Sequence, residues 1–148
     1  MSFKANKIDV SKEFCHSLYL HFSSSDAYKL HSDVKTCLER LSSAGVTMGV
    51  LSDFDVRLQG ILEGLGIDSY FKFIIQSHVE GYSKPSKELW QAALQKAGSV
   101  DEGYHVGDDP KKDAFLDART IILDREHNIT TSFTKISSLE ELPDLLNI

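Results

Sequence analysis

The sequence predicts an α/β fold in which a partial parallel sheet is covered by helices on both faces. Short apolar runs alternate with longer amphipathic segments along the chain, which is typical of βα units. With 148 residues, 41% of them hydrophobic, the chain is long enough for one domain with a buried core. No linker rich in Pro, Gly or Ser divides it. We therefore expect a single globular body.

Four apolar runs are predicted to be strands. In chain order they are residues 46–51 (VTMGVL), 71–76 (FKFIIQ), 104–106 (YHV) and 120–123 (TIIL). Each is short and lies between segments with helical periodicity, so the runs are best explained as strands of one parallel sheet.

Several other segments carry the helical spacing of apolar residues. The clearest are residues 33–43 and 87–97, and residues 57–65 and 139–146 are further candidates. The N-terminal stretch SKEFCHSLYLHF, followed by the turn-like SSSD, fits both a helix and an alternating strand. We favour the helix.

Charge and cysteine content restrict the classes of partner and compartment. The net charge is −6 and the Lys and Arg residues are scattered, which argues against a nucleic-acid or anionic-membrane surface. No apolar run approaches the roughly 20 residues of a membrane helix. Cys15 and Cys37 lack CxxC spacing and no signal peptide precedes them, so we expect reduced thiols and a protein of the cytoplasm, or of the nucleus as well.

Polar residues follow three of the predicted strands. Ser52 follows the first, Lys84 comes shortly after the second, and Asp108, Asp109 and Asp113 follow the third. Ligands of open α/β sheets bind beyond the carboxyl ends of the strands. A hydroxyl, an ammonium and carboxylates at one rim could bind a phosphoryl group and Mg²⁺. Each alone has an ordinary explanation as a helix cap, a solvated loop residue or helix N-terminal charge.

The residues from 45 to 94 and the string HVGDDPKKDAF resemble the haloacid dehalogenase-like hydrolase superfamily. The likeness covers about residues 14–123 and depends on the linked Ser, Lys-Pro and Gly-Asp-x4-Asp motifs. It implies that Ser52 is the phosphate-binding hydroxyl of the second motif and Lys84 the lysine of the third. It also implies that Asp108 and Asp113 are the acidic pair of the fourth motif, with Asp108 a Mg²⁺ ligand.

The resemblance further implies a DxDx(T/V) motif with the nucleophilic aspartate, and no DxD precedes Ser52. We therefore predict a remnant of the cap helix and turn in residues 1–26 and a truncated core domain in residues 27–148. The central first strand is missing in this interpretation. The chain would be catalytically inactive by itself, and its Mg²⁺ site weak or vestigial. Asp53, where the family usually has Asn, and the extra Asp109 would both repel a phosphate.

Loss of a central strand would separate residues 46–51 from residues 104–106. Unpaired strand edges are costly. Either the two strands pair directly, or the segment SLYLHF or a second copy of the chain fills the gap. We predict an unstable or self-associating chain.

Two other functions stay open. VTMGVLSDFDVR is itself an apolar strand followed by a DxD, so Asp53 could be the nucleophile of an active Mg²⁺-dependent phosphohydrolase, with Ser77 as the second-motif hydroxyl. Arg57 then stands where Thr or Val is expected. Alternatively, the chain is a binding or assembly module that completes its sheet with a strand from a partner.

Overall fold

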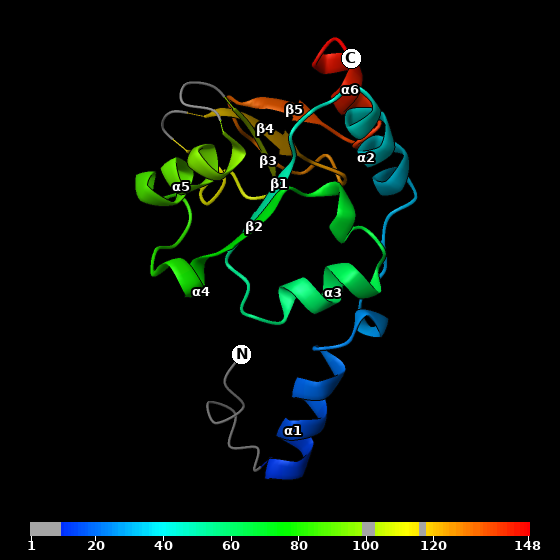
Figure 1. The fold of residues 1–148 in the computed structure, drawn as a ribbon, viewed down its shortest axis with the longest axis vertical. Helices are drawn as coiled ribbons and strands as arrows, with labels where there is room; N and C mark the ends of the chain where they lie inside the picture. Colours follow the sequence, from blue (N-terminus) through cyan, green and yellow to red (C-terminus); the bar gives the residue numbers. More distant parts are fainter. Residues whose placement is uncertain (1–9, 99–102, 116–117) are drawn as a thin grey trace.

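The computed structural model describes residues 10–98, 103–115 and 118–148. Within these residues, parallel strands form two sheets flanked by helices (Figure 1). One sheet pairs β1 (Gly49–Ser52) with β2 (Phe73–Gln76). The other has the order β3 (Tyr104–Gly107), β4 (Arg119–Leu123), β5 (Thr134–Ile136). The predicted α/β class with parallel strands is confirmed.

The described α-helices match the predicted segments, except that α4 was not predicted. Their bounds are α1 Lys12–His21, α2 Asp33–Ser43, α3 Leu58–Gly64, α4 Ser77–Glu80, α5 Lys87–Ala97 and α6 Glu141–Leu145, with 3-10 turns at Ser25–Ala27 and Asp68–Tyr70. α2 and α5 have the predicted bounds, whereas α3 and α6 are shorter than predicted. α5 begins where the Ser86 hydroxyl accepts a hydrogen bond from the backbone N–H of Leu89, and it ends at Gly98 in the left-handed conformation.

The four predicted strands are present, but the first two begin later than predicted. The backbone N–H of Val46 bonds to the carbonyl of Leu41, so the turn after α2 extends into the run predicted as strand. Strand β5 was not predicted from the sequence. This strand has three residues, of which only Ile136 is buried, so it carries almost no periodic signal.

The ambiguous N-terminal stretch is helical, as favoured. The Ser11 hydroxyl caps α1 by accepting from the N–H of Phe14, and α1 has no buried residue. In Figure 1 it projects away from the sheets. The guanidinium of Arg57 lies 4.8 Å above the Tyr19 ring and links α1 to the body. Because SLYLHF is part of this helix and its end, it does not supply the additional strand.

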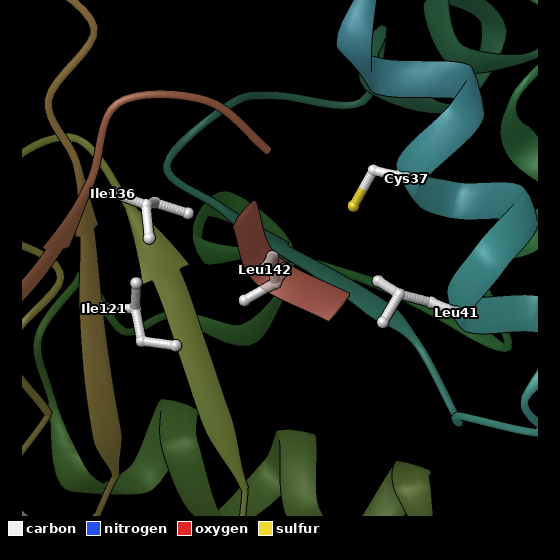
Figure 2. Packing of buried hydrophobic residues seen from close by; sticks show 5 residues of the cluster. All are labelled: Cys37, Leu41, Ile121, Ile136 and Leu142. Atoms are coloured by element: carbon white, nitrogen blue, oxygen red, sulfur yellow. The ribbon is translucent and has the colours of Figure 1, made fainter. Parts of the chain in front are cut away.

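One face of the sheets is covered by α2, α3 and α6. Figure 2 shows Cys37 and Leu41 of α2 and Leu142 of α6 directed toward Ile121 of β4 and Ile136 of β5. Leu38, the residue after Cys37 in α2, lies in a second cluster. This cluster contains Leu62 and Ile67 and packs against residues of β1 and β2. α2 therefore contacts both sheets.

The opposite face is covered by α5. Leu89, Trp90 and Ala93 of this helix pack with Ile75 of β2 and with Phe115, which follows β3. The Trp90 ring stacks on Phe115 at 5.5 Å between centroids. Helices thus cover both faces, as predicted, and on each face they connect the two sheets.

The first and third predicted strands, β1 and β3, do not pair directly with each other in the described structure. β1 and β3 line the same cavities, yet no backbone ladder joins them in the part of the chain that the structure describes. We call the space between these two strands the β1–β3 gap. The sheets are connected across it by side-chain packing under α2 and α5 and not by strand hydrogen bonds.

None of the described helices has the length and apolar character needed to cross a bilayer.

Candidate functional site

The predicted site residues lie at the carboxyl ends of the strands. Ser52 ends β1, and Asp108 follows Gly107, the last residue of β3. Lys84 lies between α4 and α5, and its ammonium is 2.6 Å from Oδ1 of Asp113. This ion pair connects the loop after β2 with the loop after β3. It therefore spans the β1–β3 gap at the rim where a ligand is expected.

Asp113 is the most buried member of the site, with 1% of its surface exposed. Its Oδ1 also accepts from Nε2 of His105 at 2.8 Å, and its Oδ2 accepts from the backbone N–H of Asp109 at 2.9 Å. Burial would raise the pKa of Asp113, but hydrogen bonds from His105 and Lys84 outweigh it and hold the pKa well below its usual range. Asp113 is therefore a carboxylate whose oxygens are already occupied by donors.

Gly107 makes room for this carboxylate. A Cβ on Gly107 would overlap the Asp113 side chain, so the close approach of the loop to β3 requires glycine. The glycine of the HVGDD string thus has a structural reason, which is to let Asp113 fold back against its own strand.

Ser52 and Asp53 form the other side of the rim. The hydroxyl oxygen of Ser52 accepts from the N–H of Phe54 at 3.2 Å, and Ser52 is half-buried, so its O–H can still donate to a ligand. Asp53 is exposed, and its Oδ1 accepts from the backbone N–H of Lys84 at 3.1 Å. The structure therefore brings the loops that carry Ser52 and Lys84 together.

The alternative DxD, Asp53 to Asp55, does not present two free carboxylates. Both oxygens of Asp55 are bound by the Arg57 guanidinium, with 2.7 Å between Oδ2 and Nη2. The hydrogen bonds from Arg57 lower the pKa of Asp55. A general acid or base works best with a pKa near the working pH, so Asp55 is poorly suited to that role. Ser77, which the same hypothesis makes the second-motif hydroxyl, is the first residue of α4.

The described residues do not make up a complete magnesium site. Asp108 is exposed and has no hydrogen-bond or ion-pair partner among them, but the oxygens of Asp113 are occupied by Lys84, His105 and Asp109. No group of three or more His, Cys, Asp or Glu side chains in that part of the chain is placed to hold a metal ion. Mg²⁺ prefers a near-octahedral shell of oxygens, and one open carboxylate supplies little of it.

His105 is bound to Asp113 and was not predicted from the sequence. It lies within β3, is buried, and packs edge-on against Phe115 at 4.8 Å between ring centroids. The available signal was a histidine inside an apolar strand, eight residues before an acidic residue. A buried imidazole needs a polar partner, and Asp113 is that partner.

The relationship to known proteins follows from residues 4–115, which match the family model for haloacid dehalogenase-like hydrolases. The chain belongs to this family. Over 142 residues it is 31% identical to haloacid dehalogenase-like hydrolase domain-containing protein 3 of Danio rerio, covering 88% of this chain and 58% of that protein. The Homo sapiens protein of the same name is 35% identical over 92 residues, which cover 62% of this chain and 37% of that protein. The chain thus spans between 37% and 58% of the length of these two relatives.

Solved structures agree with the family at the level of the fold. A phosphatase of this superfamily from Thermococcus onnurineus superimposes with a TM-score of 0.80 at 20% identity, covering 97% of this chain and 68% of that one. A magnesium-bound hydrolase of the superfamily from Bacillus subtilis gives a TM-score of 0.72 at 21% identity. The match covers 81% of this chain and 56% of that one. The predicted family and Rossmann-like architecture are confirmed. The missing nucleophile motif and the site residues stay predictions.

Proposed function

We propose that this chain is a haloacid dehalogenase-like domain that binds a small phosphorylated molecule through Ser52 and Lys84 but does not hydrolyse phosphoesters by itself. The observation that carries the proposal is the position of Lys84. Its ammonium lies at the carboxyl rim of the strands, beside the loop of Ser52, and the adjacent carboxylate Asp113 is buried and fully hydrogen-bonded.

Ser52 and Lys84 have complementary roles in such a site. The Ser52 hydroxyl would donate to a phosphoryl oxygen, and the Lys84 ammonium would offset the phosphoryl charge. Lys84 already neutralises Asp113, and Asp53 is an exposed carboxylate next to it. A phosphate would therefore meet little net positive charge, and we expect weak binding.

The expected lack of hydrolysis follows from the chemistry of the nucleophile. The family resemblance implies attack by a carboxylate that forms an aspartyl-phosphate. Asp113 cannot reach a substrate because it is buried and engaged by three donors. Asp108 is open but follows β3, where the resemblance assigns a metal ligand. Asp53 is the exposed carboxylate on the Ser52 side, which makes it the nucleophile of the competing hypothesis.

In this proposal the chain binds Mg²⁺ only weakly. Asp108 would hold it, and the ion would supply positive charge near the phosphoryl group. Calorimetric titration with Mg²⁺ should show weak binding that disappears in Asp108→Asn. Tight binding, or binding that Asp108→Asn leaves unchanged, would contradict this assignment.

Hydrolysis of p-nitrophenyl phosphate in the presence of Mg²⁺ tests the central point. We expect no turnover above that of Asp53→Asn, which serves as the matched variant. Turnover by the wild type that Asp53→Asn abolishes would overturn the proposal and favour the Asp53 phosphohydrolase. Binding is measured separately, as NMR shifts on addition of inorganic phosphate, which Ser52→Ala and Lys84→Met should each reduce.

A second candidate function is favoured by the β1–β3 gap. Two strand edges without a shared partner fit a module that completes its sheet with a strand from another chain.

A further inference from the structure

The geometry points to one occupant of the β1–β3 gap: an extended, apolar segment of a partner polypeptide, bound parallel to both strands and followed by a basic residue. This inference deepens the assembly function. It does not depend on phosphate binding by Ser52 and Lys84, so the two proposals fail separately.

The backbone at the gap requires a peptide partner. β1 is paired only with β2, and β3 only with β4, so each has a second edge without a ladder in the described chain. A lipid or an aromatic ligand could fill the space but could not pair with the peptide groups of both edges. A strand placed between them would pair with both.

Cavities on the two sides of the gap require apolar side chains on both faces of that strand. The larger, of about 540 Å³, lies under α2 and α6, and the smaller, of about 360 Å³, lies next to α5. Both are lined by the same six residues at the gap, which are Thr47, Gly49, Leu51, Gly103, Tyr104 and His105. Alternate side chains of one strand point to opposite faces, so they would enter the two cavities in turn.

An unpartnered buried donor supports an occupant on the α5 side. The Trp90 indole N–H is buried and has no hydrogen-bond partner within the residues that the structure describes, and Trp90 lines the smaller cavity. Buried indole N–H groups usually have an acceptor. An occupant with one small polar side chain on this face would provide it.

The length and charge of the occupant follow from the strands beside it. β1 and β3 each have four residues, which fixes a core of about four or five residues in the occupant. A parallel strand would leave the gap at the carboxyl rim, where Asp53 and Asp108 are exposed and the charge of Lys84 is committed to Asp113. This acidic rim favours Lys or Arg directly after the apolar core.

A second folded copy of the chain does not meet these requirements. The occupant must have both of its backbone edges free, whereas each described strand is already paired along at least one edge. The net charge of −6 also opposes the approach of an identical chain.

A fluorescein-labelled peptide, Ser-Gly-Val-Ile-Val-Leu-Lys-Lys, tests the inference by fluorescence anisotropy with the full chain. We expect saturable binding and slower hydrogen exchange at Gly49–Ser52 and Tyr104–Gly107. N-methylation of Ile and Leu blocks the donors of one edge and should weaken binding about tenfold or more. Replacement of Lys-Lys by Glu-Glu should weaken it as well.

Two protein variants separate the gap from the rest of the surface. Thr47→Trp places a large side chain where both cavities meet and should weaken binding, whereas Thr36→Trp, on the exposed side of α2, should not. Circular dichroism establishes that both remain folded. The inference is overturned if the peptide does not bind, if N-methylation has no effect, or if protection appears away from β1 and β3. Dimers in sedimentation whose β1 and β3 amides are protected without peptide would also overturn it, in favour of a second copy.

Discussion

Asp33 and Asp113 are both buried aspartates that accept several hydrogen bonds, yet their partners differ in kind. Asp33 is 4% exposed and begins α2. Both of its oxygens are held by the Arg125 guanidinium, at 2.7 and 3.0 Å. Oδ2 also accepts from the Ser138 hydroxyl and the backbone N–H of Leu139. The cation of Asp113 is instead Lys84, a single ammonium on a flexible stem in the loop between α4 and α5.

From this difference we expect Asp33 to stabilise the fold and Asp113 to position the proposed phosphate site. The planar fork of Arg125 ties α2 to the segment after β4, and such a two-point pair has one preferred geometry. Ser138 and Leu139 tie the same carboxylate to the segment after β5. The pair of Lys84 and Asp113 joins the loop after β2 to the loop after β3 through one ammonium, at the rim of the proposed phosphate site. Substitutions at the two aspartates should therefore differ in their effect on stability.

The largest effect is expected for Asp33→Ala. It leaves the Arg125 guanidinium without its carboxylate and the Leu139 N–H without an acceptor, and breaking a buried ion pair costs about 3–5 kcal/mol. Urea denaturation measures the free energy of unfolding. The control is Asp144→Ala, whose side chain is 75% exposed in its pair with Arg40 and which should cost no more than about 1 kcal/mol. Equal costs for the two would contradict a structural role for Asp33.

Acid should weaken the fold through Asp33 and Asp113. Hydrogen bonds from Arg125 lower the pKa of Asp33, and those from His105 and Lys84 outweigh burial to lower that of Asp113. A depressed folded pKa contributes stability that is present above the unfolded value of about 4 and is lost as the pH falls toward the folded pKa. Chemical denaturation at pH 6, 4 and 3 should show this loss. Asp33→Asn should flatten the dependence, and an unchanged slope would contradict the assignment.

A smaller loss is expected for Asp113→Asn, about 1–3 kcal/mol. The amide keeps an oxygen for one donor, His105 can remain neutral, and Lys84 can turn its ammonium toward solvent. The paired measurement is the NMR shift of the Lys84 region with inorganic phosphate. We expect Asp113→Asn to free Lys84 and increase the response to phosphate, whereas Asp33→Asn should leave that response unchanged.

The contrast between the two aspartates also explains what the sequence could predict. The Gly-Asp-x4-Asp spacing singled out Asp113, the position after a strand singled out Lys84, and the structure joins the two in an ion pair. Asp33 carries no such signal, because its partner Arg125 is 92 residues away and only the folded chain brings them together. The same limit applies to His105, whose role depends on the fold of the loop after β3.

The strands and helices were predictable for a different reason. Helices such as α2 and α5 bury one stripe of apolar residues, so their period appears in the sequence itself. β5 has three residues with one buried, which is too short for a period. The absence of direct pairing between β1 and β3 could not be read from either strand, because it depends on how α2 and α5 pack across the two sheets.

Substitutions of two glycines should change stability in opposite directions. Gly107→Ala would push a methyl group into the Asp113 carboxylate, and we expect it to cost about 1–3 kcal/mol. Gly60, inside α3, has open space where a Cβ would stand, so Gly60→Ala should raise stability by about 0.5–1 kcal/mol through helix propensity alone. Urea denaturation of both variants measures the opposite signs. Combining Gly107→Ala with Asp113→Asn then tests the cause: if the clash acts through the carboxylate, the double variant should lose less stability than the sum of the single losses. Additive losses would mean that Gly107 is needed for its strand and not for the aspartate packed against it.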